Sequence, residues 1–265
     1  MTSLEPVADL AIGAFDDTRY AKLAQSRAAQ YQSAEGFPHI VLDSFLDEPL
    51  ARSLLQAFPT SDSEVPWTIR DNTNNRRRFL EDERFMPLPI RLMLREFNSR
   101  QFLLFLETLT GIDNLLPDPY FVGGGIHISG PGDFLNIHAD FNWHHKLHAH
   151  RRVNALLYLS PDWKEEWNGA LEMWSPDMSR QVETIYPGFN RLVVFNVTDV
   201  SNHGQPKANA CPPGVYRQVL NLYYYTAKRD ESEISAPHFT AYKTENSPSA
   251  VALREGYLKS VQISS

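Results

Sequence analysis

A short alternating stretch in the middle of the chain brings together two residue types that bind metal ions. Residues 134–143 read FLNIHADFNW, with apolar residues alternating with polar ones. This alternation predicts a β-strand, because successive side chains of a strand point to opposite faces. His138 and Asp140 would therefore leave the strand on the same side. An imidazole and a carboxylate placed together in this way can contribute two ligands to a divalent metal ion.

A third candidate ligand follows a second predicted strand. Residues 191–197, RLVVFNV, form a nearly continuous apolar run, typical of a buried strand, and His203 comes shortly after it. Two histidines and one carboxylate are the ligand set of non-haem Fe(II) oxygenases, which leave coordination positions open for co-substrate and O₂. The alternative is a chance His-x-Asp pair and an ordinary surface histidine. The three residues alone leave both interpretations open.

Arg217 adds a group that this chemistry needs. It lies at the start of the predicted strand YRQVLNLYYYT, after His203 in the sequence. A guanidinium binds a carboxylate through two parallel hydrogen bonds. A dicarboxylate that chelates iron at one end requires such a partner at its other end. An exposed edge-strand arginine fits less well, because both faces of this strand are substantially apolar.

The composition is that of an ordinary globular protein. Of the 265 residues, 42% are apolar and 22% are charged, which allows one large domain with a real core. The net charge of −7 argues against a nucleic-acid partner. The single cysteine, Cys211, excludes an internal disulfide and suits a reducing compartment. No signal peptide or membrane-spanning run is evident, so we expect a cytoplasmic protein without a membrane partner.

Changes in pattern divide the chain into three parts. Residues 1–117 are predicted to form a mostly helical supporting region. Residues 118–229 carry short strand signals separated by Gly- and Pro-rich breaks, which favour an antiparallel sandwich or jelly roll. Residues 230–265 are predicted to be a polar tail with a helix near residues 249–260.

The N-terminal region contains the clearest helix signals. Asp47 is a candidate N-cap, Pro49 suits a first helical turn, and Gly111 suits a helix C-terminus. A run of charged residues, DNTNNRRR, is predicted to be a loop. The predicted segments are helices at 18–32, 47–58 and, in two pieces, 87–109; a strand at 37–46; and the loop at 71–78. Strands in the central region are predicted at 120–129, 134–141, 152–160, 169–174, 181–185, 191–197 and 215–227.

A basic, histidine-rich segment follows the predicted metal-binding strand. Residues 141–152, FNWHHKLHAHRR, should begin near the metal and are predicted to be a loop, typically a partly mobile lid. Its basic character in an acidic protein suggests an anionic group on the substrate. Trp143, Arg151 and Arg152 are the candidate substrate contacts. A second metal site within residues 144–150 is a less favoured alternative.

The run from about Gly123 to Lys228 resembles the catalytic domain of the prolyl-4-hydroxylase-like Fe(II)/2-oxoglutarate dioxygenases. The matching stretches are HISGPGDFLNIHAD, RRVNALLYLSPDWKEEWNGALEMWSPD, PGFNRLVVFNVTDVSNHGQP and YRQVLNLYYYT. The resemblance implies a double-stranded β-helix, the jelly roll of cupins, within an α+β chain that has a helical N-terminal layer. It also implies an enzyme that needs Fe(II), 2-oxoglutarate and O₂.

The resemblance assigns roles to the residues that match. His138, Asp140 and His203 would ligate Fe(II), and Arg217 would bind the distal carboxylate of 2-oxoglutarate. Tyr158, in the YLS that matches YLN in the family, would donate a further hydrogen bond to that carboxylate.

Other pocket positions add to the family pattern or depart from it. Asn154 lies on the same strand face as Tyr158 and would line the co-substrate pocket. Val219 replaces a polar residue that many members carry, and Ile128 corresponds to a tyrosine of some members. His127 or Asn136 are the candidates to replace the lost hydrogen bonds.

The reaction implied by the resemblance is hydroxylation of an unactivated C–H bond, with release of succinate and CO₂. The first hypothesis is a small-molecule substrate, such as an amino acid or a biosynthetic intermediate. One alternative is hydroxylation of a prolyl or other residue in a protein. Two alternatives of other classes are a non-catalytic, cupin-like ligand-binding protein and a zinc hydrolase that uses the same ligands.

Overall fold

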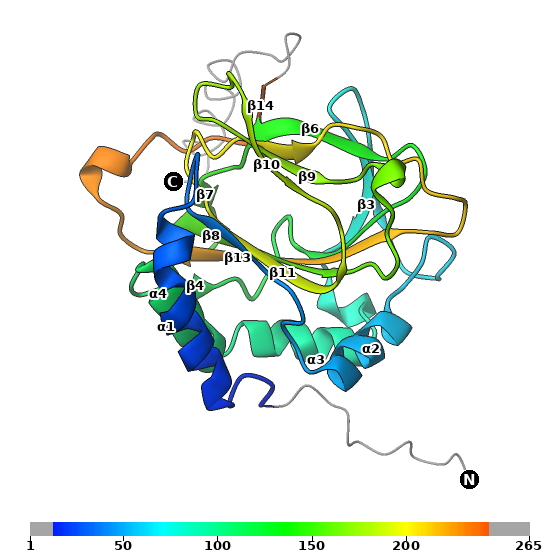
Figure 1. Cartoon of the computed structure of the whole chain (residues 1–265), viewed down its shortest axis with the longest axis horizontal. Helices are drawn as coiled ribbons and strands as arrows, with labels where there is room; N and C mark the ends of the chain where they lie inside the picture. The colour runs from blue at the N-terminus through cyan, green and yellow to red at the C-terminus, as the bar shows by residue number, and fades with distance from the viewer. Residues whose placement is uncertain (1–12, 244–265) are drawn as a thin grey trace.

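Four α-helices pack side by side along one edge of the protein (Figure 1). The computed structural model describes residues 13–243. Its α-helices are α1 (Thr18–Gln32), α2 (Glu48–Ala57), α3 (Leu88–Phe97) and α4 (Arg100–Thr110). The helices predicted at residues 18–32, 47–58 and, in two pieces, 87–109 are therefore confirmed.

Local chemistry explains where these helices begin and end. The Asp17 carboxylate accepts a hydrogen bond from the Arg19 amide at the start of α1, and the Ser99 hydroxyl accepts one from the Phe102 amide at the start of α4. Each bond satisfies an amide that has no partner within its helix. Gly111 ends α4 with φ 73°, a left-handed conformation that glycine adopts without a steric penalty.

The strands of the described residues form one antiparallel sheet that curls into a nearly closed, barrel-like jelly roll. The strands are β1 (His39–Leu42), β2 (Thr68–Asp71), β3 (Asn75–Leu80), β4 (Leu116–Pro117), β5 (Gly125–Ser129), β6 (Phe134–Ala139), β7 (Trp143–His144), β8 (Ala149–Leu159), β9 (Leu171–Trp174), β10 (Gln181–Ile185), β11 (Phe189–Asn196), β12 (His203–Gln205), β13 (Arg217–Thr226) and β14 (Ala241–Tyr242). Their order is β1-β11-β8-β13-β5-β3-β6-β12-β9-β10, with β2 beside β3, β4 beside β13, β7 beside β8 and β14 beside β6. The predicted jelly roll is confirmed.

The sheet has two layers, and the interior between them holds the polar residues. Strands β8, β11 and β13 lie against the helices, whereas β6, β9 and β10 lie on the far side (Figure 1). Along β8, Ala155 and Leu157 pack in the core beneath the helices, while Asn154 and Tyr158 face the interior of the jelly roll. A fully buried leucine contributes about 1.5–3 kcal/mol, so the helical layer fixes the strands that carry the interior residues.

The predicted loop at residues 71–78 is wrong. Strands β2 and β3 form a hairpin here, and β3 pairs further with β5 and β6. Arg76 and Arg78 tolerate this position because both form ion pairs with the buried carboxylate of Asp133. A charge run can therefore be a strand when its counter-ion comes from elsewhere in the chain.

Two further segments are more ordered than their sequence suggests. The histidine-rich segment is a hairpin of β7 and β8, and the buried His144 imidazole bonds to the Asp118 carboxylate at 3.3 Å. The polar segment after residue 229 crosses back over the jelly roll, and β14 joins β6. The helix expected near residues 249–260 lies outside the described residues. The division at residues 117 and 229 stays a prediction, although strands from all three parts share the sheet.

Within residues 13–243, no helix has both the length and the apolar character that crossing a membrane requires.

Candidate active site

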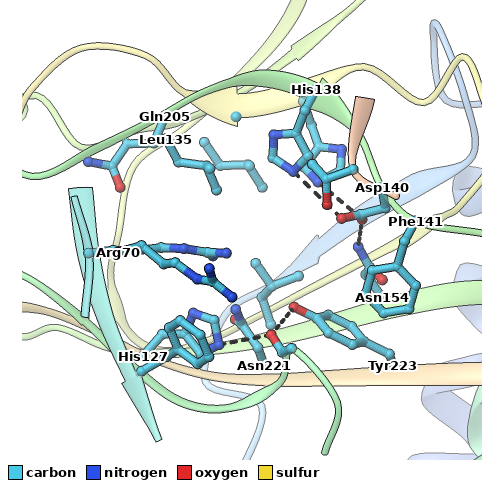
Figure 2. A pocket seen from close by; sticks show the side chains of 18 of the residues that line it. Arg70, His127, Leu135, His138, Asp140, Phe141, Asn154, Gln205, Asn221 and Tyr223 are labelled. Carbon is cyan, nitrogen blue, oxygen red and sulfur yellow. Dashed lines mark hydrogen bonds and ion pairs between the residues drawn. The ribbon is translucent and has the colours of Figure 1, made fainter. Parts of the chain in front are cut away.

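Two neighbouring strands bring the three expected metal ligands together. In the pairing of β6 with β12, His138 lies directly opposite His203, and Asp140 follows β6. One ligand atom from each residue lies within 4.8 Å of the other two, and all three residues are buried. Figure 2 shows His138 and Asp140 directed toward the same point at one end of a cavity.

Both histidines are held in the ring form that a metal requires. Nδ1 of His138 lies 2.8 Å from the Asn136 carbonyl, and Nδ1 of His203 lies 2.8 Å from the Ser201 carbonyl. A carbonyl only accepts hydrogen bonds, so each Nδ1 carries the proton and each Nε2 keeps its lone pair. These Nε2 atoms lie 3.6 and 3.4 Å from the two Asp140 oxygens. The arrangement resembles the way a hydrogen bond to one ring nitrogen orients the other toward a metal.

The charge states of the three residues also suit a cation. Burial, only partly offset by Asp140, lowers the pKa of His203 to about 4, so the ring is neutral at neutral pH. Burial alone would raise the pKa of Asp140, but Arg151 and the two histidines outweigh it and hold that pKa well below its usual range. The site therefore presents a neutral imidazole from His203 and a carboxylate from Asp140, and together with the His138 ring this donor set suits Fe(II).

The two carboxylate oxygens of Asp140 have different partners. Its Oδ2 accepts a hydrogen bond from the Asn154 amide at 2.7 Å and pairs with the Arg151 guanidinium at 3.1 Å. Oδ1 forms no hydrogen bond with either residue and remains available to a metal. Arg151 itself is fully buried and lies over the rings of Phe141 and Tyr223. Arg151 and Asn154 thus set the orientation of the carboxylate.

Arg217 and Tyr158 form a second polar group in the same interior. The Tyr158 hydroxyl accepts a hydrogen bond from Nη2 of Arg217 at 2.8 Å, and the Gly169 carbonyl accepts one from Nε at 3.1 Å. Arg217 lines the cavity, and Nη1 makes no contact with either partner. The fixed guanidinium can therefore present a planar edge to a carboxylate.

A cavity of about 320 Å³ connects the two groups. His138, Asp140, His203, Arg217 and Asn154 all line it, as does Tyr242 of β14. The Tyr242 ring lies against that of His138, with centroids 5.6 Å apart, and the Tyr242 hydroxyl accepts a hydrogen bond from Asn75. The volume falls within the range of small-molecule sites.

The three residues expected to contact the substrate lie in different surroundings. Arg151 lines the cavity, but as the partner of Asp140. Trp143 does not line the cavity but lines an adjoining, mostly apolar pocket that shares Phe141 and Phe239 with it. Arg152 pairs with Glu233 and is not part of the cavity lining.

A polar side chain lies next to Ile128, the position that corresponds to a tyrosine of some family members. Ile128 packs in the main core, and the adjacent His127 faces the cavity. Nε2 of His127 donates to the Gly123 and Gly124 carbonyls, which leaves Nδ1 as an acceptor (Figure 2). Burial lowers the pKa of His127 well below its usual range, so the ring stays neutral. Asn136 instead donates to the Thr73 carbonyl and does not line the cavity.

Several cavity residues were not identified from the sequence. They are Arg70, Arg77, Asn221, Tyr223, Phe239 and Tyr242. Alternation along β13 offered a signal for Asn221 and Tyr223, which share the strand face of Arg217. No local pattern identifies the others, because their positions depend on how the β2–β3 hairpin and β14 pair with distant strands.

Sequence comparison relates the middle of this chain to a family of Fe(II) oxygenases. Residues 124–225 match the family model described as the 2OG-Fe(II) oxygenase superfamily. A shorter stretch of 57 residues is 37% identical to the mouse prolyl 3-hydroxylase OGFOD1. That match covers 20% of this chain and only 10% of the mouse protein.

Comparison with solved structures supports the fold. A Pseudomonas putida prolyl-4-hydroxylase is 18% identical with a TM-score of 0.56, covering 77% of this chain and 98% of its own. A Trichoplax adhaerens prolyl hydroxylase, solved with a peptide fragment of hypoxia-inducible factor, is 18% identical with a TM-score of 0.52 and coverages of 82% and 93%. HygX from Streptomyces hygroscopicus, solved with nickel and 2-oxoglutarate, is 13% identical with a TM-score of 0.50 and coverages of 83% and 97%.

These matches agree with a site built from a buried His-Asp-His cluster and an arginine. The donor set suits Fe(II), and the fixed guanidinium suits a dicarboxylate. The core of this chain, residues 124–225, therefore matches the 2OG-Fe(II) oxygenase superfamily, the Fe(II)- and 2-oxoglutarate-dependent dioxygenases, in both sequence and site.

Proposed function

We propose that this protein is a dioxygenase that uses Fe(II), 2-oxoglutarate and O₂ to hydroxylate an unactivated C–H bond of a small molecule. The observation that carries the proposal is the buried cluster of His138, Asp140 and His203 in one cavity with Arg217. Bound Fe(II) with 2-oxoglutarate and O₂ supplies the oxidant that converts C–H to C–OH, with release of succinate and CO₂. A zinc hydrolase or a ligand-binding protein has no need for the dicarboxylate partner.

The residues of the chain would divide the work of binding and positioning. Nε2 of each histidine and Oδ1 of Asp140 would hold the metal, while Asn154 and Arg151 keep the carboxylate in place. Arg217 would hold the distal carboxylate of 2-oxoglutarate, supported by the Tyr158 hydroxyl. This fixes the co-substrate at both ends, so its reactive end meets the metal in one orientation.

A small-molecule substrate is supported by the size of the cavity, about 320 Å³. An amino acid or a biosynthetic intermediate is the class we propose. A cytoplasmic location rests on the single cysteine and stays a prediction.

Hydroxylation of a protein residue is a second candidate function. The local identity to the mouse prolyl 3-hydroxylase favours it. Proline-containing peptides and free amino acids, compared in one assay for succinate formation, separate the two. Stimulation by peptides alone would replace the small-molecule proposal.

The first test is an anaerobic titration of metal-free protein with Fe(II) and then 2-oxoglutarate, followed in the visible spectrum. We expect a weak charge-transfer band that requires both. Asp140→Ala should abolish the band, because the only carboxylate ligand is lost. Arg217→Ala should weaken 2-oxoglutarate binding by about tenfold to a hundredfold, the usual loss for a charge-assisted hydrogen bond.

Arg95→Ala is the control variant, because Arg95 is exposed on α3 and pairs with Glu83, and neither residue lines the cavity. It should leave the titration unchanged. A folded, iron-binding wild type that shows no band would reject the dioxygenase proposal.

A further inference from the structure

Two arginines of the β2–β3 hairpin face the cavity without an acidic partner. Arg70 and Arg77 are directly opposite each other in the pairing of the two strands, and both line the cavity. Figure 2 shows Arg70 reaching toward the cavity from the side opposite His138 and Asp140. Like charges placed opposite each other on a sheet repel, although Arg70 is exposed and solvent screens part of this repulsion, whereas Arg77 is half-buried.

Among residues 13–243, neither guanidinium forms an ion pair or a hydrogen bond, and Nε of Arg77 is buried with no hydrogen-bond partner. Glu81 lines the same cavity but forms no ion pair with either arginine. Burial raises the pKa of Glu81, and the attraction of Arg70 and Arg77 acts on it only at longer range than an ion pair.

The neighbouring arginines of β3 show what a neutralised pair looks like in this fold. Arg76 and Arg78 point to the other face of the strand and lie 3.4 and 3.7 Å from the two oxygens of Asp133. Alternation along β3 thus separates arginines with a built-in acid from Arg77, which has none.

An aromatic ring holds these two guanidiniums in position. Both Arg70 and Arg77 lie over the Phe79 ring, at 6.0 and 5.5 Å from its centroid. Phe79 in turn stacks on His127, with ring centroids 5.4 Å apart. An aromatic platform of this kind keeps a cation oriented without satisfying its hydrogen-bond donors. The donors remain available to a ligand.

We propose that Arg70 and Arg77 form a second anion site, which binds a carboxylate or phosphate group of the substrate. The proposal rests on the proposed function, in which Arg217 holds the co-substrate and leaves the hairpin arginines for the substrate. The substrate class is then an anionic small molecule whose charged group lies across the cavity from the C–H bond that is oxidised.

The test is calorimetric titration of the Fe(II)- and 2-oxoglutarate-loaded protein under anaerobic conditions, with inorganic phosphate as one probe and acetate as the other. 2-Oxoglutarate is kept saturating, so that Arg217 is occupied. We expect wild type to bind at least one probe at millimolar concentration. Arg70→Gln and Arg77→Gln should each weaken that binding by about tenfold or more. The probe that binds more tightly distinguishes a phosphate from a carboxylate substrate.

Arg76→Gln is the matched control, since it makes the same change one residue away on the opposite face. It should alter probe binding less than twofold, because Arg76 points away from the cavity and does not line it. The charge-transfer band with Fe(II) and 2-oxoglutarate reports whether each variant is folded, and serves as the measure of co-substrate affinity.

Three results would overturn the anion site, and the first two concern probe binding itself. The first is binding of neither probe by wild type, and the second is equal binding by wild type and both variants. The third is an Arg77→Gln variant that loses 2-oxoglutarate affinity but keeps probe affinity, which would assign Arg77 to the co-substrate. A wild type with no charge-transfer band but with probe binding that depends on Arg70 and Arg77 would reject the dioxygenase and leave the anion site standing.

Discussion

Arg151 is the residue whose role changed most between sequence and structure. Its place in a basic segment suggested a substrate contact, but its side chain is fully buried and pairs with Asp140. A buried carboxylate without a counter-ion is costly, and Arg151 supplies that counter-ion in the metal-free protein. The metal and Arg151 thus stabilise the same carboxylate from two sides.

Replacing Arg151 should therefore destabilise the metal-free protein strongly. We expect Arg151→Met to lower the free energy of unfolding by about 3–5 kcal/mol, the usual effect of removing one partner of a buried ion pair. Saturating Fe(II) should recover part of the loss, because the cation restores positive charge beside Asp140. Urea unfolding under anaerobic conditions, with and without Fe(II), measures both values.

Arg152→Met provides the comparison for that experiment. Arg152 pairs with the half-exposed Glu233, so its loss should cost no more than about 1 kcal/mol and should not depend on Fe(II). Equal destabilisation by the two substitutions would show that Arg151 is not the counter-ion of Asp140.

The residues that sequence alone could predict are those with local signals. His138 and Asp140 follow from alternation in one strand, and His203 follows from its place after a buried strand. The pairing of β6 with β12 confirms that these three residues lie close together. Arg70 and Arg77 could not be found in this way, because a charge run reveals neither its hairpin nor which face of the hairpin meets a cavity.

At the scale of elements, the segment after β13 closes one side of the cavity. The Asn142 side chain accepts a hydrogen bond from the His238 amide and donates to the Ala236 carbonyl. The His238 ring bonds to the Asp199 carboxylate and the Phe239 carbonyl. Composition predicted only a polar tail here. The contacts of this segment could not be predicted, because its partners are distant in sequence and no periodic pattern indicates them.

The His238–Asp199 contact makes the attachment of this segment depend on pH. Burial lowers the pKa of His238, but the bond to Asp199 and the Phe239 carbonyl outweigh it, so the pKa is raised above 6.5. A histidine with a raised pKa in the folded state stabilises fully below its unfolded pKa and loses that contribution as pH rises through the folded pKa. Asp199 has a lowered pKa, so its own contribution is lost only as pH falls below about 3.8.

His238→Asn should therefore cost up to about 1 kcal/mol at mildly acidic pH and much less at alkaline pH. The measurement is the difference in unfolding free energy between wild type and variant across this range. Asp199→Asn should remove the same pH dependence. A difference that stays constant with pH would contradict the role of the pair.

At the scale of the whole molecule, the jelly roll depends on the helices that precede it. The main core joins Phe97, Phe102 and Leu106 of the helical layer with Leu157 and Leu220 of the sheet. The sequence indicated a helical support and a β core. It could not indicate that β1 and β3 of the N-terminal part enter the same sheet, because strand pairing is set by three-dimensional contact.

A fragment of residues 118–229 should consequently fail to fold, although it contains every proposed metal and 2-oxoglutarate ligand. Removing the helices exposes one face of β8, β11 and β13, and that face is almost entirely apolar. Near-ultraviolet circular dichroism and proton chemical-shift dispersion should show a native signature for the full chain and none for the fragment. A fragment with native dispersion would prove the helical layer dispensable.

The position of Tyr242 in the chain has a consequence for how the protein matures. A ribosome synthesises the strands that carry His138, Asp140 and His203 before it reaches the strand that places Tyr242 against His138. The three ligands are therefore made before the strand that covers His138. Iron that binds before β14 joins β6 would meet His138 without the Tyr242 ring, whereas iron that binds later would meet it with that ring in place.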